Sequence, residues 1–366
     1  MKKIIIIIIS LFVLVAMAGF TGYSLLQKAM LPLDKTDTEM MRYELEAGST
    51  THVVVADLVE LQLIESEVMA NMLIRLNDWG HIQAGTYELS RAMTLEEMFE
   101  KFSTGDVVEA DVVKVVVPEG YTLFEMVTGF TSVVNMTEEE LLLALEDEVL
   151  LKQLIQDYWF LSDDILNDEL KHALEGFIYP ATYAFEVGRV YTIEELVTHL
   201  LDVTAQRFEP IKAQLQNSEL SINELITLAS IVEAETPNID EMPTVAGVFL
   251  NRINIGMGLQ SCATIQYILD ERVTHVTAEM IAIDSPYNTY SPDVTGLPVG
   301  PVGSPSIDAI QAVLTPEEND YFFFIGDVFQ CIDGKTHFFE TYEEHLAFYD
   351  QYLLPSYEAG ENVCAE

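Results

Sequence analysis

Six pairs of residues mark helix starts along this chain, and they constrain its fold more than any other sequence feature. Each pair is a Ser or Thr followed three residues later by Glu. In such a capping box the hydroxyl accepts the backbone N–H of the Glu, and the carboxylate accepts the backbone N–H of the Ser or Thr. The pairs are Thr94/Glu97, Thr122/Glu125, Thr137/Glu140, Thr192/Glu195, Ser221/Glu224 and Thr341/Glu344. Helices are therefore expected to begin at all six positions.

A strand, helix, helix, strand order comes before the helix that starts at Thr94. Residues 42–46 and 84–89 have strand patterns, and the segments between them, 51–63 and 66–77, have helical patterns. The helix that follows is expected to end at Gly105, because glycine tolerates the left-handed conformation of a helix end. The sequence predicts a small module over residues 42–106.

The rest of the chain also mixes strands with helices, so the expected fold class is α+β. Residues 112–117 predict a buried strand that turns at 118–120 into the helix capped by Thr122. Residues 321–325 predict a core strand, Asp333-Gly334 a hairpin turn and 337–339 the return strand, before a closing helix over 342–353. We divide this part into a middle α+β region, 107–215, and a last α+β region, 216–366.

The N-terminus has the pattern of a membrane-spanning helix. Two lysines precede an uncharged apolar run from Ile4 to Leu26, which as a helix is roughly 35 Å long and can cross a bilayer core. The lysines favour the cytoplasmic side, so the rest of the chain is expected outside the cytoplasm. A cleaved signal peptide ending at Ala16-Met17-Ala18 is the alternative, although the apolar run continues past it. We expect a transmembrane anchor over 1–27 and a polar stalk over 28–41.

Charge narrows the classes of ligand. The chain of 366 residues has 60 acidic and 17 basic side chains, a net charge of −43. This excess disfavours nucleic acids and anionic lipid headgroups, because both are polyanions. A weakly charged or neutral substrate is expected.

The cysteines do not form a recognisable motif. Cys262, Cys331 and Cys364 are an odd number, which fits one disulfide or three free thiols. No C-x-x-C motif or Cys/His cluster suggests a metal, and no cofactor is expected. Cys262 directly follows Gln260 and Ser261, which are candidate substrate-binding residues. A disulfide there would restrict that loop, so we expect Cys262 to be a free thiol near the substrate-binding cleft.

Glu233 is the strongest candidate for a catalytic group. It lies in an apolar helical pattern, residues 225–235, directly after Ile231 and Val232. Such a setting partly desolvates a carboxyl group, which raises its pKa and suits it to general acid catalysis. A glutamate that merely faces water at a helix end is the alternative. The other carboxylates nearby lack a comparable apolar setting in the sequence: Glu235, Asp240, Glu241 and Asp284.

Glu233 belongs to a series of short blocks in a specific order. These are ASIVEAET (229–236), VFLNR (248–252), GLQS (258–261), YNTY (287–290), GLPVG (296–300) and GKTHFF (334–339). In this order the blocks resemble the endolytic murein transglycosylases, the MltG or YceG-like family, and the resemblance covers nearly the whole chain. It implies a single-pass protein of the cell membrane with an extracytoplasmic catalytic region, here residues 216–366.

The resemblance also gives a reading of the N-terminal module. The strand, helix, helix, strand order is that of a LysM-like module, and Gly85-Thr86-Tyr87 stands where the family has alanine-glycine-tyrosine. LysM modules bind glycans that contain N-acetylglucosamine. A small module of this kind can equally serve as a scaffold.

Several polar and aromatic residues are candidates for substrate binding. Tyr287, Asn288, Thr289 and Tyr290 offer rings for sugar stacking, an amide and a hydroxyl, although Asn288 could instead stabilise a tight turn. Gln260 and Ser261 could also donate to a glycan. Arg252 could bind substrate or pair with Glu241 or a helix C-terminus, and Glu175 could line the cleft or cap the surface. Two positions depart from the family pattern: Ala181 replaces an expected aspartate, and Cys262-Ala263 replaces aspartate-proline.

The function expected from this resemblance is a lytic transglycosylase that cuts nascent peptidoglycan strands near the membrane and ends their elongation. One glutamate, Glu233, would first protonate the glycosidic oxygen and then deprotonate the C6 hydroxyl, which closes a 1,6-anhydro ring on N-acetylmuramic acid. By resemblance, its partners would be penicillin-binding glycan polymerases and other elongation or division proteins. The alternatives are a hydrolytic muramidase or glucosaminidase, which needs a second carboxylate, and a non-catalytic murein-binding scaffold.

Overall fold

The computed structural model describes residues 17, 20–108, 111–271, 273, 276–326 and 335–353. Most of the predicted anchor, the Asp333-Gly334 turn, Cys331 and Cys364 lie outside the described residues. Residues 20–29 are helical, and within the described ranges no helix combines the length and the hydropathy needed to cross a membrane. The chain divides into two compact units, Met1–Asp111 and Val112–Glu366. The fold is mixed α+β, mostly helical with small two-stranded sheets, as the sequence predicts.

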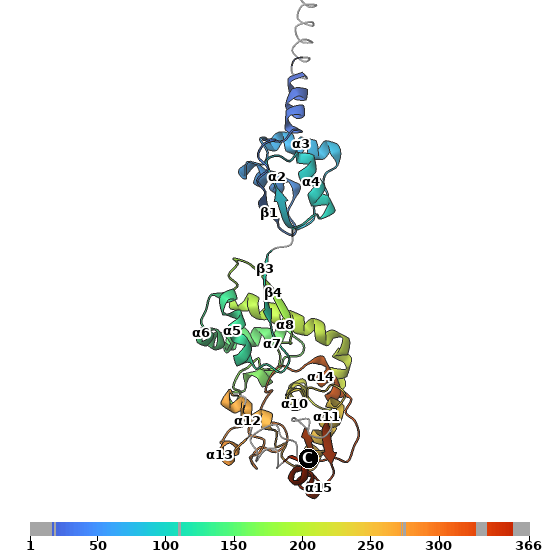
Figure 1. Ribbon diagram of the computed structural model, residues 1–366. Coiled ribbons are helices and arrows are strands. Elements are labelled where there is room, and N and C mark those ends of the chain that lie inside the picture. The colour runs from blue at the N-terminus through green and yellow to red at the C-terminus, as the bar shows by residue number, and fades with distance from the viewer. Residues whose placement is uncertain are drawn as a thin grey trace, which may run out of the picture. The chain divides into compact units, whose positions relative to one another are not determined.

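The first unit has the predicted strand, helix, helix, strand order (Figure 1). Its elements are β1 (Met41–Leu45), α2 (Thr51–Glu60), α3 (Glu67–Asn77), β2 (Gly85–Leu89) and α4 (Leu95–Thr104). The strands pair antiparallel, with Tyr43 opposite Tyr87, and Tyr87 is fully buried. The ring of Phe102, from α4, packs edge-on against Tyr87 at 4.8 Å between centroids. The core of this unit is therefore held between the two-stranded sheet and its helices.

All six capping boxes form as predicted. In each of α4, α5 (Leu123–Val134), α6 (Glu138–Leu145), α8 (Ile193–Phe208), α10 (Ile222–Glu235) and α15 (Tyr342–Phe348), the hydroxyl and carboxylate bonds are both present. The predicted end of α4 is also confirmed, because Gly105 is its C-cap with φ of +69°. Local side-chain chemistry therefore fixes where these helices begin.

The second unit contains two further antiparallel strand pairs. β3 (Val112–Val116) pairs with β4 (Thr182–Glu186), and β5 (Phe323–Gly326) pairs with β6 (Thr336–Phe339). The prediction that residues 112–117 form a buried strand is wrong in part, because Val112, Val113 and Val116 are exposed while Val115 is buried. The sheet has only two strands, so most of β3 stays exposed and only Val115 is buried within it. The predicted core strand β5 is only half-buried.

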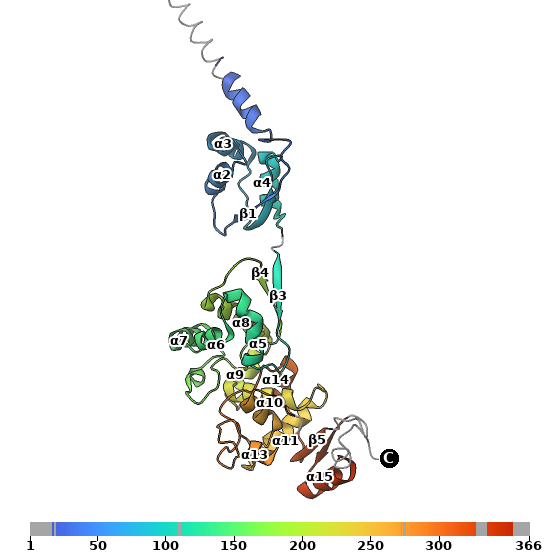
Figure 2. The same ribbon diagram turned by 60° about the vertical axis from the view of Figure 1, so that its left-hand side comes forward.

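Helix α10 is at the centre of the second unit (Figures 1 and 2). Its residues from Leu225 to Val232 are all buried. It packs against α11 (Met242–Asn254), α12 (Cys262–Leu269) and α14 (Ile307–Leu314). A helix that is apolar all round is expected to be enclosed in this way. The last turn of α10 emerges from this packing and carries Glu233.

The remaining elements of the second unit connect these parts. They are α7 (Glu148–Asp157), α9 (Lys212–Asn217), α13 (Ala278–Ile281), the 3-10 turns Asp163–Leu166 and Glu209–Ile211, and a π-helical turn, Tyr349–Leu353. The last follows α15 directly, so the predicted closing helix over 342–353 is α15 extended by a wider turn.

Candidate active site

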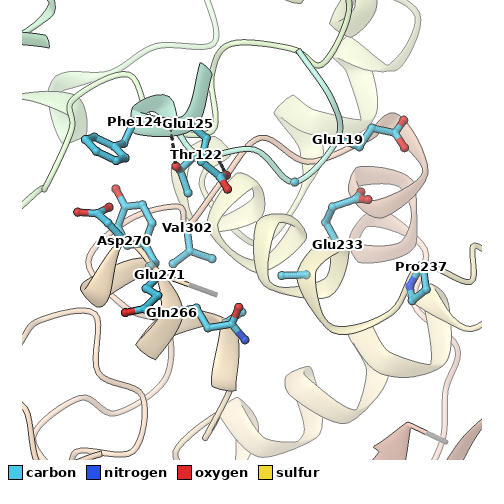
Figure 3. A pocket seen from close by; sticks show the side chains of 14 residues that line it. Glu119, Thr122, Phe124, Glu125, Glu233, Pro237, Gln266, Asp270, Glu271 and Val302 are labelled. Carbon is cyan, nitrogen blue, oxygen red and sulfur yellow. Dashed lines mark hydrogen bonds between the residues drawn. The ribbon is translucent and has the colours of Figure 1, made fainter. Parts of the chain in front are cut away.

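A pocket of about 300 Å³ lies in the second unit at the end of α10 (Figure 3). Residues before and within α5, the last turn of α10, and α12 line it, together with Val302. Five lining side chains are carboxylic acids: Glu119, Glu125, Glu233, Asp270 and Glu271. No lysine or arginine is among the lining residues, all of which the structure describes. The pocket is therefore suited to a ligand without strong negative charge.

Glu233 lies at the edge of this pocket and is half-buried. Its Oε2 accepts the backbone N–H of Ser306 at 2.9 Å. Ser306 is the N-cap of α14, and its own hydroxyl accepts the N–H of Ala309 at 3.1 Å. The Glu233 carboxylate thus meets the N-terminal end of α14, where backbone N–H groups favour negative charge. This contact fixes the orientation of the predicted catalytic group.

Glu119 lines the same pocket and is absent from the sequence-based candidates. It lies in the turn between β3 and α5, directly before Gly120. Burial raises the pKa of Glu119, and the negative charges of Glu233 and Asp308 raise it further. The sequence signal that could have revealed it is the polar turn Pro118-Glu119-Gly120 directly after a strand.

Glu235 faces a different part of the structure from Glu233. It is not among the pocket-lining residues, and its Oε1 accepts the hydroxyl of Ser261 at 2.5 Å. Two residues along a helix are about 200° apart, which explains the difference in direction. Burial raises the pKa of Glu235, while the Ser261 hydrogen bond and the charge of Arg252 oppose this effect. The sequence-based view that Glu235 lacks a desolvated setting is therefore wrong, because residues distant in sequence enclose it.

Ser261 and Thr289 join the loop before α12 to the YNTY block. The backbone N–H of Ser261 donates to Thr289 Oγ1 at 3.0 Å, and that of Gln260 donates to the Thr289 carbonyl at 3.1 Å. Ser261 and Thr289 are buried, whereas the Gln260 side chain is exposed, on a residue with φ of +50°. Of these three predicted binding residues, only Gln260 presents its side chain to solvent.

Tyr287, Asn288 and Tyr290 also have partners within the protein. Tyr287 is buried; its hydroxyl accepts the N–H of Lys171 at 3.2 Å, and its ring lies 4.8 Å from that of Tyr267. The Asn288 amide donates to the carbonyls of Ile281 and Ile283 at 2.9 and 2.7 Å, which is the turn-stabilising alternative. Tyr290 is half-buried with its hydroxyl 3.2 Å from Cys262 Sγ. None of the three lines the pocket, and direct substrate contact by them stays a prediction.

Arg252 makes its hydrogen bonds to backbone carbonyls within the protein. It is buried, its Nε donates to the Phe322 carbonyl at 2.6 Å, and its Nη1 donates to the Leu259 carbonyl at 2.5 Å. Its suggested partner Glu241 instead accepts the hydroxyl of Thr336 at 2.5 Å. Arg252 therefore connects α11 to the chain before β5 and to the loop before α12.

Glu175 is buried between α5 and α12, two elements that line the pocket. It is 1% exposed, both of its oxygens accept the N–H of Leu123, at 2.9 and 3.1 Å, and Oε2 also accepts the Tyr267 hydroxyl at 3.1 Å. The suggestion of a surface cap is wrong, because Glu175 caps the first turn of α5 from the interior. Burial raises its pKa to about 7, against the opposing influence of His172, these hydrogen bonds and Lys171. Glu175 thus links α5 to α12, two walls of the pocket.

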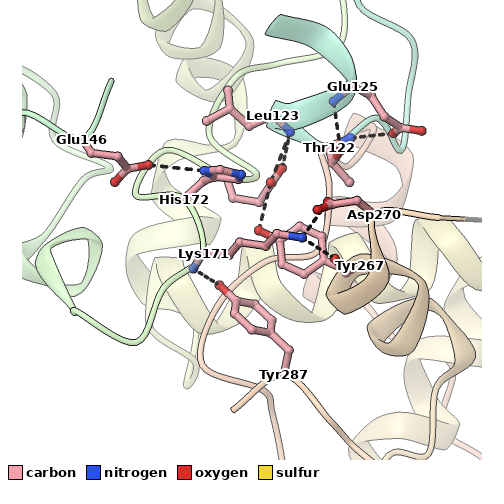
Figure 4. A network of polar contacts seen from close by, with 10 residues as sticks. Thr122, Leu123, Glu125, Glu146, Lys171, His172, Tyr267, Asp270 and Tyr287 are labelled. Atoms are coloured by element: carbon pink, nitrogen blue, oxygen red, sulfur yellow. Dashed lines mark hydrogen bonds and ion pairs between the residues drawn. The ribbon is translucent and has the colours of Figure 1, made fainter. Parts of the chain in front are cut away.

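Lys171 fixes the same wall from the side. Its Nζ donates to the Tyr267 carbonyl at 2.7 Å and to Asp270 Oδ1 at 2.6 Å (Figure 4). Both partners belong to α12 or its C-cap and line the pocket. No group of three or more His, Cys, Asp or Glu side chains in the described residues is placed to hold a metal ion.

Comparison with known proteins identifies the family of this chain. The sequence profile described as the YceG-like family matches residues 43–351. The chain belongs to the YceG-like family. A crystal structure of a YceG-like protein from Listeria monocytogenes is similar, with a TM-score of 0.60 and 32% sequence identity, over 85% of this chain and 99% of that one.

Proteins of two further genera are similar to this chain. Two proteins of Streptococcus pneumoniae, each named endolytic murein transglycosylase, are 28% identical over 347 residues, which is 91% of this chain and 62% of each relative. The endolytic murein transglycosylase of Bacillus subtilis is 28% identical over 333 residues, 91% of this chain and 89% of that protein. The chain thus spans less than two thirds of the streptococcal relatives. The site of this YceG-like protein combines Glu233 with the end of α14 and an acidic pocket.

Proposed function

We propose that this YceG-like protein is an endolytic murein transglycosylase. It would cleave the β-1,4 bond between N-acetylmuramic acid and N-acetylglucosamine in nascent strands, leave a 1,6-anhydro end and so terminate elongation. The observation that carries the proposal is the position of Glu233, at the end of a buried helix, in a pocket and oriented by Ser306. The names of the relatives from two genera support it.

The chemistry proposed for Glu233 needs no external nucleophile. The Glu233 carboxyl gives its proton to the glycosidic oxygen as the bond from that oxygen to C1 of N-acetylmuramic acid breaks. The C6 hydroxyl oxygen of the same sugar bonds to C1, and its proton passes to the Glu233 carboxylate. One proton leaves Glu233 and one returns, so the glutamate ends as it began. No water is consumed, and the product is one water lighter than a hydrolysis product.

A hydrolytic muramidase is the second candidate, and Glu119 is the observation that favours it. A glycosidase uses two carboxyl groups, one as acid and one as base or nucleophile. Glu119 and Glu233 line one pocket, so such a pair is available. Mass spectrometry of the products formed from purified glycan strands in ¹⁸O-labelled water separates the two functions. We expect 1,6-anhydro ends without label; labelled reducing ends would instead assign the protein to the hydrolases.

We also propose that the protein acts at the cell membrane, tethered by residues 4–26 with its site on the extracytoplasmic side. The charge pattern at Lys2 and Lys3 supports this orientation. There it would meet glycan polymerases and other elongation or division proteins, and the LysM-like order of the first unit supports glycan binding by that unit. Intact-mass measurement of the protein from membranes should give the full chain; a chain that begins at Gly19 would contradict the anchor.

A further inference from the structure

Two carboxyl groups line the same pocket although they come from distant parts of the chain. Glu119 precedes α5 and Glu233 ends α10, and Figure 3 shows both on the same side of the pocket. The segment between Val302 and α14 holds them together. Gly120 N–H donates to the Ser304 carbonyl at 2.8 Å, and Ser304 N–H donates to the Tyr121 carbonyl at 2.8 Å. Two residues later, Ser306 N–H donates to Glu233.

Close backbone packing makes this arrangement specific. A Cβ atom on Gly303 would lie 2.9 Å from the Gly120 carbonyl oxygen, and Gly303 has φ of +154°. Only glycine permits both this conformation and this approach. A Cβ on Gly120 would lie 3.7 Å from Glu233 Cγ, so the stem of Glu233 passes directly beside the turn that carries Glu119. Backbone contacts therefore bring the turn that carries Glu119 next to the last turn of α10, which carries Glu233.

The surroundings of the pair are acidic. Burial and the charges of Glu233 and Asp308 all disfavour the ionised form of Glu119, whereas Glu233 receives the N–H of Ser306. Two neighbouring carboxylates that both carry charge repel each other, so such a pair retains one proton to a higher pH than either group alone. The other titratable groups that line the pocket or influence Glu119 and its neighbour Tyr179 are Glu125, Tyr267, Asp270, Glu271, Asp308 and Arg207.

We propose that Glu119 and Glu233 form a carboxyl pair that shares one proton, and that Glu119 thereby keeps a proton available to Glu233 for glycosidic cleavage. Glu119 is a positioning residue in this scheme, because it acts on the substrate only through Glu233. The inference rests on the proposed function, since the shared proton matters for catalysis only if Glu233 acts on the glycosidic bond.

The test is the pH profile of glycan cleavage by full-length wild type and Glu119→Gln. Removing the charge of Glu119 should allow Glu233 to lose its proton at lower pH. The fall in activity on the basic side of the profile, its basic limb, should therefore occur at a pH lower by about one unit or more. At pH values above it, the variant should have roughly one tenth of the wild-type activity. At pH 5 the variant should approach the wild-type rate. An equal loss at every pH, or an unmoved limb, would overturn the inference.

Glu271→Gln is the matched control. It removes the same charge from the same pocket, but Figure 3 shows Glu271 on the opposite side from the pair. Its basic limb should stay where the wild-type limb lies. A limb that moved as far as in Glu119→Gln would mean that any charge in the pocket has this effect, and the specific pairing would be wrong.

A measurement without catalysis separates this inference from the proposed function. In a carboxyl ¹³C NMR titration, the chemical shift of the Glu119 carboxyl should change with a midpoint at lower pH in Glu233→Gln than in wild type, because the neighbouring charge is gone. Identical titration in the two proteins would exclude the pair even if 1,6-anhydro products form. A clear shift alongside labelled hydrolysis products would retain the pair and reject the transglycosylase.

Discussion

The Ser261 hydroxyl donates to Glu235 at 2.5 Å, so Glu233 and Glu235, both at the end of α10, contact different parts of the protein. Glu233 meets the pocket and the start of α14, whereas Glu235 binds the residue that precedes α12. A main-chain hydrogen bond from Ala263, in the first turn of α12, also favours the Glu235 carboxylate. Glu235 therefore takes the place of the side-chain cap that Ser261 does not provide.

Glu233→Gln should leave the protein folded and reduce the cleavage rate by at least about 10²–10⁴-fold, the loss typical of a general acid–base group. The glutamine amide oxygen can still accept the Ser306 N–H, but it cannot exchange the proton. Rates on purified glycan strands and a thermal unfolding curve measure both effects. Glu224→Gln is the control: it removes a charge from the same helix, and glutamine retains the capping box with Ser221. Near-wild-type cleavage by Glu233→Gln would remove Glu233 from the mechanism.

Glu235→Gln should affect cleavage far less than Glu233→Gln, because Glu235 does not line the pocket. Glu235→Ala should instead destabilise the protein by about 1–3 kcal/mol, since the buried Ser261 hydroxyl would lose its acceptor. Urea unfolding of both variants gives the free energies. If Glu235→Gln abolished cleavage in a stably folded protein, Glu235 would have a direct role in the chemistry.

Glu175→Gln should change stability in a pH-dependent way. Because burial raises the folded-state pKa of Glu175 from 4.5 to about 7, its favourable contribution is complete below about pH 4.5 and lost as pH rises to about 7. The variant does not titrate, so its stability relative to wild type should improve across this range, by up to about 1.4 kcal/mol per pH unit. Urea unfolding at pH 5 and pH 8 tests this. The exposed Glu169→Gln should show a constant difference from wild type, and a constant difference for Glu175→Gln would contradict the prediction.

Cys262→Ser should keep the cleavage rate within a few-fold of wild type. Cys262 is exposed and has no disulfide partner among the described residues, and a serine hydroxyl can replace Sγ as the partner of the Tyr290 hydroxyl. Cys331, its possible disulfide partner, lies outside the described residues, so the redox state needs a direct measurement. A non-reducing peptide map should recover the peptide of Cys262 unbridged; a bridge to Cys331 would contradict the prediction.

Local chemistry explains what the sequence could predict. A capping box needs only two side chains three residues apart, and Thr94/Glu97 or Ser221/Glu224 forms the same contacts wherever the helix packs. The module of β1, α2, α3 and β2 is similarly readable, because its turns and periodicities are short-range.

The site was harder to predict because its contacts are long-range. An aromatic and polar loop such as Tyr287-Asn288-Thr289 has the same composition whether it binds a sugar or, as here, buries its side chains against Tyr267, Ile281 and Ser261. Glu119 shares no local pattern with Glu233, and their proximity depends on the segment around Ser304. Sequence periodicity cannot predict that two residues so far apart in the chain line the same pocket.

The pocket takes residues from both sides of the predicted division at residues 215 and 216. Thr122 and Glu125 come from the earlier region, while Glu233 and Gln266 come from the later one. A chimera of two family members joined at that division would therefore combine pocket residues from two different proteins. An exchange from Val112 onward, where the second unit starts, would instead transfer all the residues that line the pocket.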